Sequence, residues 1–201
     1  DRAHLPERFG LFTLIFLGEF VGAAMGGMRE QGAATPVAAA AAILGMALTF
    51  SLWWAYFDAL RAAFPTAAWA SGANGLGLLW AGAHLPLAFG IALVAIGVEH
   101  VIILNGTEHL HGAAPWLLTG GLAVILVALG VIGLASACRR TLPARRRVLR
   151  THVLLAVAIF GFAWIAGAIP SVWVVAALFV ASLLAIAFTR RMDAAADCAS
   201  T

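Results

Sequence analysis

The chain has 201 residues, of which 63% are hydrophobic and only 10% are charged, and its mean hydropathy is +1.00. Soluble globular domains carry about 45–50% apolar and about 25% charged residues, so this composition excludes a soluble domain and indicates a protein surrounded by lipid. The formal net charge of +3 comes from arginines that flank apolar segments, which argues against a nucleic-acid partner. We therefore predict an all-α bundle of about six transmembrane helices in a lipid bilayer.

Six apolar segments are long enough to span a hydrocarbon core of about 30 Å, at about 1.5 Å of rise per helical residue. In chain order they cover residues 9–28, 36–63, 76–104, 115–138, 148–169 and 170–189. Pro36 and Pro115 stand where two of these segments begin, and proline is favoured in the first turn of a helix. We expect residues 1–189 to form one transmembrane domain and residues 190–201 to form a polar cytoplasmic tail.

The arginines predict how this bundle is oriented. Six spans place both chain ends on one side of the membrane, and all arginines but Arg29 fall on that side: Arg2, Arg8, Arg61, Arg139, Arg140, Arg145, Arg146, Arg147, Arg150, Arg190 and Arg191. Cytoplasmic loops of membrane proteins are enriched in Lys and Arg. The split therefore predicts a cell inner-membrane protein with both termini in the cytoplasm.

The first three spans carry Glu19, Asp58, His84 and Glu99, ionisable residues that are costly in hydrocarbon. Glu19 is ten residues into the first span, Asp58 is about five residues from the end of the second, and His84 is about eight residues into the third. By helical rise, these depths allow all three to converge in the half of the bundle nearest the termini. Glu99 lies fifteen residues beyond His84 and belongs to the opposite end, with His100.

A set made of Glu19, Asp58 and His84 has the chemistry of a proton relay or a cation site, because such groups can exchange protons near neutral pH when buried. Carboxylates and imidazole also suit Zn, Mn or Fe, but no two of the three share the i, i+3 or i, i+4 spacing of common metal sites. A structural alternative stays open. In it, Asp58 pairs with Arg61, and His84 bonds a backbone carbonyl that Pro86 leaves unpaired.

Four segments of the first half resemble the motifs of one family. They are HLPERFGLFTLIFLGE at His4–Glu19, LWWAYFD at Leu52–Asp58, AHLPL at residues 83–87 and GVE at residues 97–99. In this order they resemble the HxxERFGLxTIIxLGE, WWxYFD, YxHLPL and GxE motifs of the bacterial low temperature requirement protein A (LtrA) family. The resemblance implies a polytopic membrane protein whose motif positions are His4, Glu7, Arg8, Glu19, Asp58, His84 and Glu99. Family members are longer, with the ERFG segment near the middle, so the resemblance also implies that this chain corresponds to their C-terminal half.

Three functions remain open at this point. The first is an ion- or proton-coupled transporter or channel that uses Glu19, Asp58, His84 and Glu99 as a relay, with His4, Glu7, Arg8 and Arg61 as charges at its inner mouth. The second is a structural or sensory membrane protein without transport. The third is an intramembrane metal-dependent enzyme.

We favour the transporter or channel, because carboxylates on separate helices suit an ion relay and no nucleophile or oxyanion motif is visible. Enzyme activity is therefore not expected, and the sequence identifies neither a cofactor nor a metal. Besides the lipid bilayer, the expected partner is an N-terminal half or a second copy of the chain, and no nucleic acid.

Overall fold

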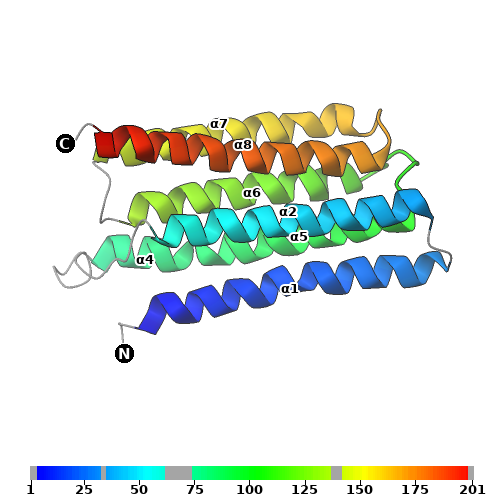
Figure 1. The fold of residues 1–201 in the computed structure, drawn as a ribbon, viewed down its shortest axis with the longest axis horizontal. Coiled ribbons are helices and arrows are strands. Elements are labelled where there is room, and N and C mark those ends of the chain that lie inside the picture. Colours follow the sequence, from blue (N-terminus) through cyan, green and yellow to red (C-terminus); the bar gives the residue numbers. More distant parts are fainter. Residues whose placement is uncertain (1–3, 33–34, 62–73, 137–141, 199–201) are drawn as a thin grey trace.

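The computed structural model describes residues 4–32, 35–61, 74–136 and 142–198. Within these ranges the helices are α1 (Leu5–Gln31), α2 (Pro36–Arg61), α4 (Asn74–Gly82), α5 (His84–Ile103), α6 (Ala114–Ala135), α7 (Leu142–Ala166) and α8 (Ser171–Cys198). The segments long and apolar enough to cross a membrane are Leu5–Gln31, Pro36–Leu60, Gly75–Ile103, Ala114–Ala135, Arg145–Ala166 and Ser171–Met192. The prediction of an all-α bundle with six spans is confirmed (Figure 1).

The spans run along one long axis, and both chain termini lie at the same end of the bundle (Figure 1). We call this the terminal end, and the opposite end the far end. Helices α1 and α7 begin at the terminal end and α8 finishes there, so Arg8, Arg146 and Arg190 all lie toward it. Arg29 is in the last turn of α1, at the far end. Among the described residues, Arg29 therefore lies at the opposite end of the bundle from Arg8, Arg146 and Arg190.

A proline interrupts the third span. Pro86 has no N–H group, and its ring clashes with the carbonyl four residues earlier, so a regular helix cannot continue through this point. The chain turns at Ala83, but Ala83 N still donates to Leu79 O at 3.0 Å and Leu87 N donates to Ala83 O at 3.2 Å. Helices α4 and α5 therefore remain one span, and the break places His84 at the start of α5.

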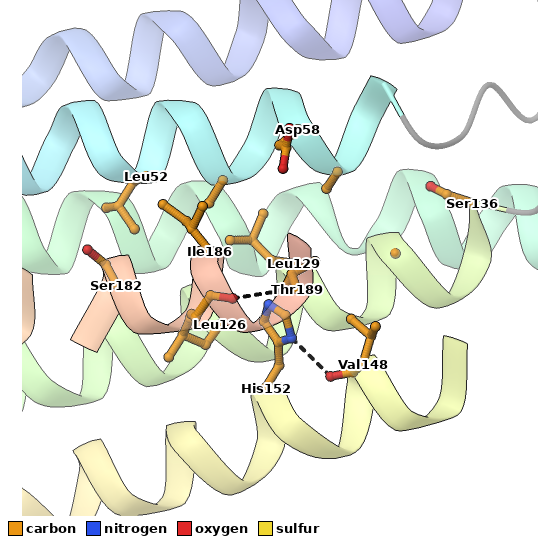
Figure 2. Close-up of a pocket in the computed structure, with 14 residues that line it drawn as sticks. Leu52, Asp58, Leu126, Leu129, Ser136, Val148, His152, Ser182, Ile186 and Thr189 are labelled. Carbon is orange, nitrogen blue, oxygen red and sulfur yellow. Dashed lines mark hydrogen bonds between the residues drawn. The ribbon is translucent and has the colours of Figure 1, made fainter. Parts of the chain in front are cut away.

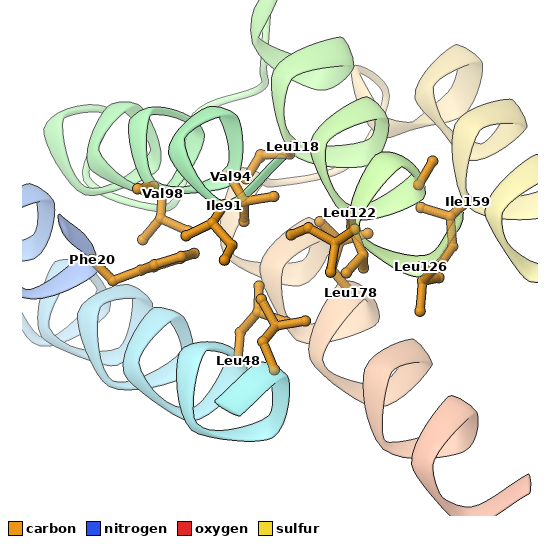
Figure 3. Close-up of a cluster of buried hydrophobic side chains, with 14 of the residues drawn as sticks. Phe20, Leu48, Ile91, Val94, Val98, Leu118, Leu122, Leu126, Ile159 and Leu178 are labelled. Carbon is orange, nitrogen blue, oxygen red and sulfur yellow. The ribbon is translucent and has the colours of Figure 1, made fainter. Parts of the chain in front are cut away.

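Aliphatic side chains fill the middle of the bundle. Helix α6 packs against both α5 and α7, while α1 packs mainly on α5 and α8 mainly on α2. The buried side chains at the centre include Leu48, Ile91, Val94, Leu122 and Leu126 (Figure 3). Large apolar side chains also cover the outward faces of α1, α7 and α8, as expected for surfaces that contact lipid tails.

Two glycines set the distance between α5 and α6. A Cβ atom on Gly90 would lie 2.8 Å from the Gly121 carbonyl oxygen, and one on Gly121 would lie 3.0 Å from the Gly90 carbonyl oxygen. The two backbones are in direct contact here, and a larger residue at either position would separate them. Small residues commonly serve this purpose in membranes, where lipid supplies no hydrophobic force between helices.

At the far end, the loop after α5 joins three spans. Asn105 and Gly106 hold positive φ angles of 62° and 68° and turn the chain out of α5. The Thr35 hydroxyl, just before α2, donates to Asn105 Oδ1, and Val172 N at the start of α8 donates to Gly106 O at 3.0 Å. These bonds hold α2, α5 and α8 together at the end opposite the polar cavity described next.

Candidate functional site

A narrow cavity of about 30 Å³ lies between α2, α6, α7 and α8, in the half of the bundle nearest the terminal end (Figure 2). Aliphatic side chains form most of its wall, and its polar members are Asp58, Ser136, His152, Ser182 and Thr189. One water molecule needs about 10–15 Å³ of such space, so the cavity can hold a few. Polar groups from four segments thus face a space for water inside an apolar bundle.

Asp58 forms a two-point ion pair with Arg190. Arg190 donates from Nε to Oδ2 and from Nη2 to Oδ1 of Asp58, at 3.1 Å each. The guanidinium also lies over the Trp54 ring, 4.7 Å from its centroid. The Asp58 side chain is 25% exposed and that of Arg190 is 48% exposed, so the pair stands at the outer edge of the cavity. This fork geometry fixes both orientation and distance, and it joins α2 to α8.

His152 faces the cavity from α7. Its side chain is buried, and Nδ1 lies 2.9 Å from the Val148 carbonyl oxygen (Figure 2). Since a carbonyl only accepts, Nδ1 is the donor, and in the neutral ring the lone pair belongs to Nε2. The α7 helix thus presents a buried imidazole of defined orientation to the cavity.

Hydroxyl groups complete the polar wall of the cavity. Ser182 Oγ lies 2.5 Å from Ser51 Oγ, and the Thr189 hydroxyl donates to the Ala185 carbonyl at 2.8 Å. Ser136 Oγ is buried, and none of the described protein atoms forms a hydrogen bond with it. A buried hydroxyl of this kind costs free energy unless water bonds it. Ser136 therefore marks a position for water in the cavity.

A second polar cluster, which we call the His84 cluster, lies between α1, α2 and α5. His84 is 1% exposed, its Nδ1 lies 2.9 Å from the Trp80 carbonyl oxygen, and its Nε2 lies 3.1 Å from the Tyr56 hydroxyl. Because Nδ1 donates to the carbonyl, Nε2 of the neutral ring accepts the Tyr56 proton. The Phe9 ring lies 4.5 Å from the imidazole, centroid to centroid.

The cavity and the His84 cluster share α2 but use opposite faces of it. Tyr56 and Asp58 are two residues apart, and two residues in an α-helix turn the side chain through about 200°. Tyr56 therefore faces α1 and α5, whereas Asp58 faces α8.

The sequence of the whole bundle matches one known family. The family described as bacterial low temperature requirement A protein (LtrA) matches residues 1–188. The chain belongs to the LtrA family. The motifs identified in the sequence end at Glu99, so the LtrA match extends over α6, α7 and most of α8, which enclose the cavity. No curated protein and no solved structure matches the chain.

In this LtrA protein, the three residues expected to converge lie in different environments. Asp58 borders the cavity, His84 is bonded to Tyr56, and Glu19 is exposed on the outward face of α1. All three are among the described residues, and no hydrogen bond or ion pair joins any two of them. Within the described ranges, His, Cys, Asp and Glu side chains form no group of three or more that could hold a metal.

The rotation of α1 explains the position of Glu19. Its buried residues include Leu17, Phe20, Ala24 and Gly27, whose spacing of three and four forms one stripe against α5. Glu19 falls outside this stripe and is exposed, as are its neighbours along the outward face.

The remaining predicted residues lie at the two ends of the bundle. Glu99 is half-buried between α1 and α5, and a Cβ on Gly26 would lie 2.5 Å from its Oε1, so this glycine makes room for the carboxylate. At the terminal end, His4 Nδ1 lies 3.1 Å from Glu7 Oε2, and both side chains are exposed, as is Arg8. The side chain of Arg61 lies outside the described part of the structure.

Sequence reasoning missed two residues of the site. Asp58 pairs with Arg190, 132 positions away, whereas the sequence offered only Arg61, three positions away, as a partner. His152 was overlooked although it lies inside the fifth predicted span, residues 148–169. A survey of every ionisable residue inside a span would have found it, since His152 lies within the apolar segment Arg145–Ala166.

Proposed function

We propose that this LtrA-family chain is a proton- or cation-coupled transporter or channel of the cell inner membrane, with Asp58 as the residue that exchanges the ion. The observation that carries the proposal is the cavity in which Asp58, His152 and Ser136 face a water-sized space within an apolar bundle. Ionisable groups inside transmembrane segments are costly, and those that face a wet cavity usually mark an ion pathway.

The ion pair supplies a way to couple ion binding to a change of shape. A proton on the Asp58 carboxylate removes the charge that holds Arg190, so α8 separates from α2 at the terminal end. The far end stays joined by the bond from Val172 to Gly106. The proton then leaves Asp58 through the water of the cavity, which His152 also lines, and Asp58 pairs with Arg190 again. A metal cation that competes with Arg190 for the carboxylate would act in the same way.

The other candidate residues have supporting positions in this proposal. His84 and Tyr56 hold α2 against α5 and thereby fix the direction of Asp58. The charges at His4, Glu7 and Arg8 lie at the terminal end, which we place in the cytoplasm because arginines gather there.

We also propose that a further transmembrane segment, from an N-terminal half or a second copy, covers the outward face of α1. Gly18 and Gly22 are exposed on α1, and no described atom lies within 4 Å of a Cβ built at either position. Small residues four apart allow another helix to approach closely, and Glu19 between them is costly in lipid unless a neighbouring helix bonds it.

A structural or sensory protein without transport is the second candidate. It is favoured by the pairing itself, since Asp58 has two bonds from Arg190 and both ring nitrogens of His84 are bonded. In that case the polar groups only hold the helices in place.

Proton flux into proteoliposomes separates the two candidates. The purified chain is reconstituted with a pH-sensitive dye inside, and a potassium gradient with valinomycin supplies the driving potential. We expect flux above that of protein-free vesicles, and a loss of about tenfold or more in Asp58→Asn, because the amide cannot exchange the proton. Glu30→Gln is the matched control, since it removes an exposed carboxylate at the far end, away from the cavity. No flux with the unaltered chain, or equal flux in Asp58→Asn and the unaltered chain, would contradict transport through Asp58.

A further inference from the structure

A large apolar groove lies on the outward surface of the bundle, away from the Asp58 cavity. Its volume is about 800 Å³, within the range of about 300–1,000 Å³ that small-molecule sites occupy. Helix α6 forms its floor with Gly120, Ala123 and Val127, while α4 and α5 form one wall and α7 forms the other. Its lining is almost wholly apolar, as a site for an acyl chain would be.

The α7 wall continues into two arginines. Val153, Val157 and Phe160 line the groove and are spaced four and three residues apart, on one face of the helix. The same spacing, continued toward the terminal end, reaches Arg150 and then Arg146. Both arginines are exposed, so the apolar wall leads directly to a pair of positive charges at the level of the membrane surface.

Side-chain contacts between α6 and α7 lie at each end of the groove. Arg145, one residue before Arg146, donates to the Leu134 carbonyl at 3.2 Å and so points toward α6. At the other end, the Phe160 ring lies 5.2 Å from that of Trp116, centroid to centroid, and Trp116 lies 5.3 Å from Trp164. This aromatic cluster bounds the groove in the direction of the far end. The groove is therefore open toward positive charge and bounded by rings at the opposite end.

We propose that this groove binds an anionic phospholipid, with its acyl chain along α6 and its phosphate on Arg146 and Arg150. The charge complementarity selects the occupant. Guanidinium groups form paired, charge-assisted hydrogen bonds with phosphate, and an arginine one turn inside the hydrocarbon boundary extends its head to the surface. A zwitterionic lipid fits the same apolar groove, but its own positive charge is repelled by the arginines. The proposal does not depend on transport.

Lipid titration with native mass spectrometry tests the site on the full chain. The detergent-purified protein is titrated with phosphatidylglycerol and with phosphatidylcholine of identical acyl chains. We expect one molecule of phosphatidylglycerol to bind with an affinity about tenfold or more above that of phosphatidylcholine. This preference should weaken as the salt concentration increases. In the Arg146→Gln/Arg150→Gln variant the preference should disappear, while binding of phosphatidylcholine stays unchanged.

Two further variants separate the groove from general surface charge. Arg147→Gln is the control, because it removes one positive charge from an exposed position that lies about 80–140° around the helix from Val153, Val157 and Phe160. Val127→Phe fills the floor of the groove from a position that is 37% exposed, and should lower the affinity for both lipids with the arginines intact.

The proposal is wrong if phosphatidylcholine binds as tightly as phosphatidylglycerol, or if Arg147→Gln lowers the preference as much as the double variant. It is also overturned if the lipid-free protein is a dimer that Val127→Phe converts to a monomer, because a second copy then occupies the groove.

Discussion

The Tyr56 hydroxyl on α2 and Nε2 of His84 on α5 lie 3.1 Å apart in the interior of the bundle. Tyr56 is 1% exposed, so water cannot replace this bond if one partner is removed. The contact ties α2 to the broken third span, two residues before Asp58 points to the other side of α2. It therefore links the packing of the core to the geometry of the cavity.

Removal of this hydroxyl should destabilise the protein. Tyr56→Phe keeps the ring but leaves Nε2 of His84 buried and unbonded, which costs about 1 kcal/mol in free energy of unfolding on the scale of hydrogen bonds in membrane proteins. Thermal unfolding in nanodiscs measures the loss. Thr151→Val is the control, because the Thr151 hydroxyl bonds only the carbonyl four residues earlier in its own helix. Equal melting temperatures for Tyr56→Phe and the unaltered chain would show that the bond contributes nothing.

The number of spans could be predicted from the sequence, because hydropathy indicates which segments are long and apolar enough to cross a membrane. The third span was expected at residues 76–104 and lies at Gly75–Ile103, and the break at Pro86 follows from the chemistry of proline. Hydropathy carries no information about which spans are neighbours. The pairing of Asp58 with Arg190 depends on the contact of α2 with α8, so the nearer Arg61 was the natural expectation.

The direction of Glu19 could not be predicted for a related reason. Depth along a helix follows from the rise per residue, but the rotation of a helix about its axis depends on its neighbours. The side chains of α1 are apolar on every face of the helix, and exposed ones include Leu11, Ile15 and Met25. No polar face therefore marks the outward direction. Only the packing of Phe20 and Leu17 against the bundle shows that Glu19 faces away from it.

One methyl group added where α5 crosses α6 should destabilise the protein. A Cβ on Gly121 would lie 2.7 Å from Val94 Cγ2 and 3.0 Å from the Gly90 carbonyl oxygen, which is backbone and cannot move aside. We expect Gly121→Ala to destabilise the protein by about 1–3 kcal/mol through overpacking. Gly22→Ala adds the same methyl group where no described atom lies within 4 Å, and should change the stability of the isolated chain little. Denaturation in detergent compares the two, and equal stabilities would contradict the close contact.

Exchange of Asp58 and Arg190 should restore part of the stability that is lost when the charge of either residue is reversed alone. Asp58→Arg places two guanidinium groups together at the α2–α8 contact, and Arg190→Asp places two carboxylates there, so each lowers the melting temperature. The double variant re-creates an ion pair with the opposite sense and should regain part of the loss. Recovery will be incomplete because Trp54 then has no cation over its ring. A double variant no more stable than the worse single one would show that the two residues do not interact.

The outward face of α1 should lie against another helix in the membrane. Gly22→Cys, in a background where Cys138 and Cys198 are replaced by Ser, should form a disulfide with Gly22→Cys of a second copy under oxidation in native vesicles. Ile43→Cys is the control, since Ile43 is 69% exposed on the apolar surface of α2. Glu19→Leu should weaken the Gly22→Cys cross-link, because it leaves the bonding group of the opposite helix without its carboxyl partner. A product of twice the mass identifies a second copy. Cross-linking no stronger at position 22 than at position 43 would show that lipid alone covers α1, and the exposed carboxyl of Glu19 would then stand in hydrocarbon, where such groups are costly.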